Sequence, residues 1–232
     1  MRYQILGEDL QVVEVELQEG EKLYSEAGAM FWMTSNVNMR ATTGGKGFLD
    51  GLIKVAKRAI SGESLALVEY TIRGSSGKVV LAAPWAGKII PYEISSSKSL
   101  ILQKGAYLAH VGELDISITF TKRLTSGFFG GEGFILQKLS GEGLVFFFAG
   151  GYIQTVELQA GESISVDTGC LVGFEDTVDY SVEMLKDIGT WFFGGEGALL
   201  AKLTGPGKVW LQSMPISNFA LRLIPFLRRT LK

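Results

Sequence analysis

The chain of 232 residues is 47% hydrophobic and 20% charged, with a formal net charge of −2. This composition is typical of a packed globular protein, and the small net charge gives no overall attraction to nucleic acid, so we expect no DNA partner. The single cysteine, Cys170, excludes an internal disulfide and a cysteine-only metal site. The single histidine, His110, excludes a paired-histidine zinc site, and no cofactor is predicted.

The first residues of the chain contain no apolar signal-peptide core. The sequence also contains no run of about 18 apolar residues, the length that a membrane-spanning helix requires. The sequence therefore predicts a cytoplasmic protein, and two basic segments described below allow a peripheral position on a membrane.

Short β-strands bounded by glycine turns recur along the chain. Residues 10–17 alternate apolar with polar side chains, which predicts a half-buried strand, and residues 23–32 predict a pair of strands broken at Gly28. Five further segments alternate with period two or follow a glycine turn with β-branched and aromatic residues: 79–81, 115–120, 144–148, 179–184 and 209–211. These patterns predict an all-β fold of β-sandwich modules.

One long motif occurs twice, and weaker matches extend the repeat. Residues 128–141 reappear as residues 192–205, an offset of 64 positions without a gap. Ser99, Leu100, Leu102 and Gly105 precede their counterparts by the same offset, and residues 15–21 match residues 156–162. We therefore predict three tandem modules. Their expected bounds are residues 1–76, 77–150 and 151–214, followed by a tail at residues 215–232.

Two segments have helical spacing of apolar residues together with basic side chains. Residues 47–60 predict a helix in the first module, and the tail from residue 216 onward contains no acidic residue. Their apolar faces either cover the sheets or dock on an anionic membrane surface or a protein partner. The basic residues concerned are Lys54, Lys57, Arg58, Arg222, Arg228, Arg229 and Lys232.

Two glycine-rich turns hold the most conspicuous candidate chemistry. A glycine turn that opens a helix can bind an anion, but the spacing of a phosphate-binding loop is absent. We therefore interpret each turn as architectural and expect it to lead into a short helical insertion in its module, with the glutamate favourable in the first turn. Glu132 and Glu196 belong to separate modules, so we expect their carboxylates to lie too far apart for catalysis by a carboxylate pair. The residues are Gly130, Gly131, Glu132, Gly133, Gly194, Gly195, Glu196 and Gly197.

Aromatic residues are expected in the core or at interfaces between modules or subunits, because no basic residues are interleaved with them as in a base-stacking site. We interpret His110 and Cys170 as structural residues. The interface candidates are Phe128, Phe129, Phe192, Phe193 and Trp210.

The segments 61–65, 192–197 and 203–215 resemble a widespread prokaryotic family that has a fungal relative named for altered inheritance of mitochondria. The resemblance implies three tandem domains similar in fold to the tryptophan RNA-binding attenuation protein, assembled as a homotrimer. It also implies a scaffold role, because the fungal relative is linked to organisation of the mitochondrial inner membrane.

The sequence therefore predicts a non-enzymatic scaffold or binding protein of unknown biochemical role. We expect several copies of the chain to assemble, and the assembly to contact an anionic membrane surface or a protein partner. One alternative is a ring that binds a small ligand or RNA in grooves between modules. A second alternative is a hydrolase whose site the sequence does not reveal.

Overall fold

The computed structural model describes residues 1–43, 66–122, 134–184, 199–220 and 222–223. These residues form seventeen β-strands, a 3₁₀ turn (η1, Lys104–Ala106) and a short helix at residues 216–220 and 222–223. The predicted all-β fold class is therefore confirmed. The strands are β1 (Arg2–Leu6), β2 (Val12–Gln18), β3 (Leu23–Glu26), β4 (Met30–Met33), β5 (Val37–Thr43), β6 (Ala66–Ile72), β7 (Ser76–Ala82), β8 (Gly87–Ile94), β9 (Leu100–Gln103), β10 (Tyr107–Lys122), β11 (Phe134–Gly150), β12 (Ile153–Leu158), β13 (Ser163–Asp167), β14 (Leu171–Glu175), β15 (Asp179–Met184), β16 (Leu199–Thr204) and β17 (Gly207–Gln212).

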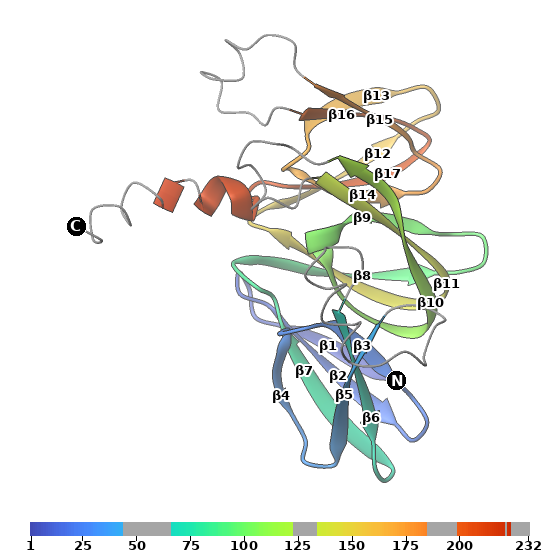
Figure 1. Ribbon diagram of the computed structural model, residues 1–232, viewed down its shortest axis with the longest axis vertical. Helices are drawn as coiled ribbons and strands as arrows, with labels where there is room; N and C mark the ends of the chain where they lie inside the picture. Colours follow the sequence, from blue (N-terminus) through green and yellow to red (C-terminus); the bar gives the residue numbers. More distant parts are fainter. Residues whose placement is uncertain (44–65, 123–133, 185–198, 221, 224–232) are drawn as a thin grey trace.

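The strands form three antiparallel sheets, which together make an elongated molecule (Figure 1). A four-stranded sheet, β1-β2-β7-β4, lies at one end, and a three-stranded sheet, β13-β16-β15, lies at the other. A ten-stranded sheet extends along the molecule beside both smaller sheets (Figure 1). Its strand order is β12-β17-β14-β9-β11-β10-β3-β6-β5, with β8 also paired to β11. The C-terminal helix projects from one side of this column (Figure 1).

The strand register repeats along the chain. Ser117 on β10 lies opposite Lys138 on β11, and 64 positions later Ser181 on β15 lies opposite Lys202 on β16. The same irregularity in register also occurs three times, in the pairs β4–β7, β10–β11 and β14–β17. In each pair, two residues of one strand advance against one residue of the other, which is the geometry of a β-bulge. The internal similarity of the sequence is thus matched by the pairing of the strands.

The pairing of the strands differs from one of the predicted module boundaries. β7 pairs with β2 and β4, so it groups with the first module although the predicted boundary at residue 76 assigns it to the second. The helix expected at residues 47–60 lies outside the described residues. The short helices expected directly after the other two glycine turns were wrong, because β11 begins at Phe134 and β16 begins at Leu199, and alternating burial along β16 favours a strand. The likeness to the tryptophan RNA-binding attenuation protein stays a prediction of the resemblance.

Three apolar clusters form the core, and strands of neighbouring modules share them. β11 is buried along its C-terminal half, with Phe146 in one cluster and Phe147 in the next. Successive residues of a strand point to opposite faces, so this strand separates two cores. Burial alternates along β2 by contrast, so this strand has one buried face and one partly exposed face. Neighbouring modules are therefore fused by shared hydrophobic burial rather than joined by flexible linkers.

Candidate docking surfaces and cleft

An exposed apolar face marks the C-terminal helix. Pro215 is buried and accepts hydrogen bonds at its carbonyl from the N–H groups of Asn218 and Phe219, at 3.1 and 3.2 Å, which begins the helix. Ile216, Phe219 and Leu223 then follow at spacings of three and four residues and are 44%, 44% and 41% exposed. Such spacing places the three side chains on one face of a helix. This face lacks a covering partner among the described residues of the subunit.

A second exposed apolar surface lies on β4 at the far end of the molecule. Met30, Phe31 and Trp32 are 37%, 63% and 42% exposed. Sequence reasoning predicted a strand here but missed its exposure, because a run of apolar residues does not show whether another element covers the strand. Within the described chain β4 pairs with β7 alone, so its other backbone edge is available for hydrogen bonding.

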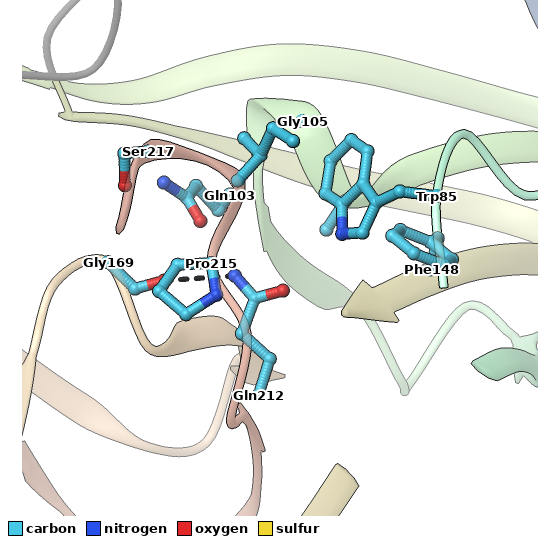
Figure 2. A pocket seen from close by; sticks show the side chains of 10 residues that line it. Trp85, Gln103, Gly105, Phe148, Gly169, Gln212, Pro215 and Ser217 are labelled. Carbon is cyan, nitrogen blue, oxygen red and sulfur yellow. Dashed lines mark hydrogen bonds between the residues drawn. The ribbon is translucent and has the colours of Figure 1, made fainter. Parts of the chain in front are cut away.

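A cleft of about 70 Å³ lies where the second and third modules meet (Figure 2). Its wall includes Trp85, which packs edge-on against Phe148 with ring centroids 4.8 Å apart, and the start of the C-terminal helix. The indole Nε1–H of Trp85 is buried and has no hydrogen-bond partner among the residues that the structure describes. An unpaired buried donor beside a cleft is a candidate ligand contact, because its desolvation is otherwise uncompensated.

Gln212 connects the two modules beside this cleft. Its Oε1 accepts a hydrogen bond from the N–H of Gly150, and its Nε2 donates one to the carbonyl of Gly169, both at 2.9 Å. Figure 2 shows the second of these bonds next to Pro215. A single side chain thus satisfies one backbone donor and one backbone acceptor from different modules.

The single histidine lies in a polar cluster between the first and second modules. His110 is 4% exposed, and its Nδ1 lies 2.8 Å from the hydroxyl of Tyr107. Burial lowers the pKa of His110 to about 4, so the ring is neutral at physiological pH. On the next strand Tyr24 donates to the Glu69 carboxylate at 3.0 Å, and burial together with this bond raises the pKa of Tyr24 to about 12. Glu69 also pairs with Arg40 at 3.1 Å.

Comparison with known proteins identifies the family. The sequence profile described as mitochondrial biogenesis AIM24 matches residues 3–214. The chain belongs to the AIM24 family. An uncharacterised protein of Streptococcus pyogenes serotype M6 is 28% identical over 218 residues, which cover 90% of this chain and 84% of that protein. The crystal structure of another Streptococcus pyogenes protein superposes with a TM-score of 0.78 at 26% identity, covering 97% of this chain and 99% of that one.

Two of the site residues predicted from the sequence have described positions in this AIM24-family chain. Trp210 is 5% exposed on β17 and packs edge-on against Tyr92 and Phe147 of the second module, with ring centroids 5.3 and 5.4 Å apart. Arg222 is exposed on the C-terminal helix. The other predicted residues lie outside the described residues: Lys54, Lys57, Arg58, Phe128, Phe129, Gly130, Gly131, Glu132, Gly133, Phe192, Phe193, Gly194, Gly195, Glu196, Gly197, Arg228, Arg229 and Lys232.

Membrane-spanning helices and metal-binding clusters are both absent from the described residues of this AIM24-family chain. No helix there is both long and apolar enough to cross a membrane. No cluster of three or more His, Cys, Asp or Glu side chains with metal-binding geometry occurs in the same part of the chain.

Proposed function

We propose that this AIM24-family protein is a non-enzymatic scaffold, built from several copies of the chain, that docks on an anionic membrane surface through its C-terminal helix. The observation that carries the proposal is the exposed apolar face formed by Ile216, Phe219 and Leu223. A helix that lies in a membrane interface needs such a face together with basic residues beside it.

The charge of the tail supplies the second requirement. Residues 216–232 contain Arg222, Arg228, Arg229 and Lys232 and no acidic residue. Each basic residue near an anionic surface contributes about 1 kcal/mol of attraction, and each apolar side chain that enters the interface contributes roughly 1.5–3 kcal/mol. Because these apolar side chains are already more than half covered, one tail gains only part of that contribution, and several tails on one assembly bind together more tightly through avidity.

The role of the remaining chain follows from its residues. The buried His110 is held by Tyr107, an arrangement that favours a structural role over proton transfer with a substrate. The rigid column of shared cores supplies a platform on which tails and partners are held at fixed positions.

Vesicle flotation tests the membrane proposal. The wild-type chain is expected to float with phosphatidylcholine vesicles that contain phosphatidylserine, to remain behind with phosphatidylcholine alone, and to dissociate as salt screens the charges. The double variant Phe219→Ser/Leu223→Ser should lower vesicle binding at least tenfold. The matched control is Met39→Ser, which changes a 51% exposed residue on β5 and should bind as the wild type does. Equal binding by the double variant and the wild type would refute the proposal.

We infer a second candidate function for the cleft between the second and third modules, namely binding of a small molecule with one hydrogen-bond acceptor on an apolar body. The unpaired indole N–H of Trp85 supports it, as do the apolar neighbours Phe148 and Pro215. Thermal shift against a set of small carbonyl compounds tests this function. Stabilisation of the wild type but not of Trp85→Phe is expected, and stabilisation of both variants by the same compounds would contradict it.

A further inference from the structure

The cleft between the second and third modules lies beside the base of the C-terminal helix. Pro215, which begins the helix, and the next two residues, Ile216 and Ser217, form part of the cleft wall. Ile216 is also 44% exposed and forms, with Phe219 and Leu223, the apolar face of the helix, here called the docking face. One side chain therefore belongs to both surfaces, and a ligand in the cleft would contact the residue at which the docking face begins.

The unpaired indole donor of Trp85 is held beside this helix base. An added Cβ on Gly150 would lie 2.5 Å from Nε1 of Trp85, so the indole nitrogen occupies space that a larger residue at position 150 would fill. The polar backbone groups of Gly150 already have partners, because its carbonyl accepts from the N–H of Met214 at 3.1 Å and its N–H donates to Gln212. Figure 2 shows the nitrogen on the edge of the indole that is turned toward Pro215 and Gln212. A ligand in the cleft can thus satisfy the donor.

The chemistry of the wall favours an uncharged acceptor. None of the residues that line the cleft in the described part of the chain is charged, and the other polar side chains there are Gln103, Gln212 and Ser217. A phosphate or carboxylate in such a site would lose its hydration without gaining a cation, at a large cost in free energy. A carbonyl oxygen loses less and can accept the indole hydrogen bond. The space of about 70 Å³ suits such a group with a few carbons and is too small for a whole lipid headgroup.

A carbonyl group on an apolar chain is available where the docking face would lie. A helix that binds in a membrane interface places its apolar face about 5–10 Å into the boundary between headgroups and acyl chains. The glycerol esters of phospholipids occupy this boundary. Tryptophan is favoured at the same depth, because its ring is apolar and its N–H finds an acceptor there.

We propose that the cleft binds the ester carbonyl of a membrane phospholipid, which accepts a hydrogen bond from the indole N–H of Trp85. The first carbons of the acyl chain pack against Phe148 and Pro215, and the chain leaves the cleft past Ile216 onto the docking face. The headgroup stays outside the uncharged cleft. This inference rests on the proposed membrane docking and names the lipid group that the cleft recognises.

Nuclear magnetic resonance of the full, isotope-labelled chain tests the contact. The probe is dihexanoylphosphatidylserine below its micelle concentration, and the comparison lipid carries the same headgroup on ether-linked chains, which lack the carbonyl. The indole N–H resonance of Trp85 is identified as the one that Trp85→Phe removes. The ester lipid is expected to move this resonance downfield, and the ether lipid should leave it in place. Equal shifts with both lipids, or no shift with either, would overturn the proposal.

Vesicle flotation measures the same contact on a membrane. Vesicles of phosphatidylcholine and phosphatidylserine are made once from ester lipids and once from ether-linked lipids, so that the surface charge is the same. The wild type is expected to bind ester vesicles about fivefold more tightly, the factor that corresponds to one hydrogen bond of about 1 kcal/mol. Trp85→Phe should bind both kinds equally. Trp32→Phe is the matched control, because it removes an indole at a 42% exposed position on β4, and it should keep the fivefold preference.

The possible results distinguish the lipid contact from the two proposed functions. Equal binding of the wild type to ester and ether vesicles would keep membrane docking and overturn the lipid contact. Stabilisation by small carbonyl compounds without a response to the ester lipid would keep the cleft as a binding site and overturn its lipid ligand. A chain that floats with neither kind of vesicle, while the ester lipid still moves the Trp85 resonance, would refute docking by the helix and support the ester contact.

Discussion

The ring of His110 stacks on the ring of Tyr24 across the junction between the first two modules, with centroids 4.9 Å apart and planes inclined by 21°. The equivalent pair at the next junction is Phe174 and Ile101, so the same position carries an apolar contact there. A buried imidazole at a junction makes the stability of that junction depend on pH.

Acidification is expected to destabilise the first junction. The pKa of His110 is about 4 in the fold and about 6.5 in an unfolded chain, so the unfolded state binds the proton first as pH falls. Stability is therefore complete above about pH 6.5 and declines toward pH 4, by about 2 kcal/mol at pH 5. Urea unfolding at pH 7.5 and pH 5 measures this difference. The control is His110→Phe, which copies Phe174 and should lose the part of the pH dependence caused by the imidazole; an undiminished dependence would contradict this origin.

Truncation of Trp210 should weaken the core between the second and third modules. Its ring packs edge-on against Tyr92 and Phe147, and Trp210→Ala leaves a cavity that costs roughly 3–5 kcal/mol. Denaturant titration measures the loss. Trp32→Ala, at a residue 42% exposed, is the control and should change the free energy of unfolding of an isolated subunit by less than about 1 kcal/mol. Similar losses for both variants would show that Trp210 is not a core residue.

Replacement of Gln212 by leucine tests how much the two hydrogen bonds of its side chain contribute to the free energy of unfolding. Gln212→Leu keeps similar volume but leaves the Gly150 N–H and the Gly169 carbonyl unpaired, at a cost of about 2 kcal/mol. The control is Gln154→Leu at an exposed position of β12, and its free energy of unfolding should differ from that of the wild type by less than about 0.5 kcal/mol. The measurement is the urea midpoint of each variant, and a neutral Gln212→Leu would show that water replaces both bonds.

Substitution of Gly112 should cost more than substitution of another glycine of similar backbone conformation. Gly112 has φ +108°, and an added Cβ would approach the carbonyl oxygen of Glu142 to 2.5 Å. Gly20 has φ +84° with open space around the added atom. We expect Gly20→Ala to lower the free energy of unfolding by about 1 kcal/mol, because alanine is strained in the left-handed backbone conformation. Gly112→Ala should lower it by about 3 kcal/mol, because the clash with the neighbouring backbone adds to that strain. Thermal unfolding compares the two, and equal losses would mean that β10 and β11 move apart without cost.

The sequence was sufficient to predict the all-β fold class and the repeat, because alternation and a constant offset can be read from the sequence itself. It predicted short helices after the glycine turns, where β11 and β16 begin instead. Ser117 and Ser181 could be recognised as equivalent by their offset, and their strands pair in the same register. The exposure of Phe31 could not be predicted, since it depends on whether a neighbouring module covers β4. For the same reason, burial of Glu69 beside Arg40 and Tyr24 required the paired strands to be seen together.

The candidate sites also differ in how much of each could be predicted from the sequence. Basic composition pointed to the tail, and the structure adds the helix face that Ile216, Phe219 and Leu223 expose. The cleft beside Trp85 had no sequence signal, because its wall combines segments that are far apart in the chain. The glycine-rich turns and the basic segment at residues 47–60 stay predictions, as they lie outside the described residues.

The most direct test of the scaffold is the mass of the purified chain in solution, measured by light scattering with and without anionic vesicles. The account predicts a mass of several 25.2 kDa subunits that moves into the vesicle fraction when phosphatidylserine is present. A 25.2 kDa monomer at every concentration, absent from the vesicle fraction, would contradict both the assembly and its membrane docking.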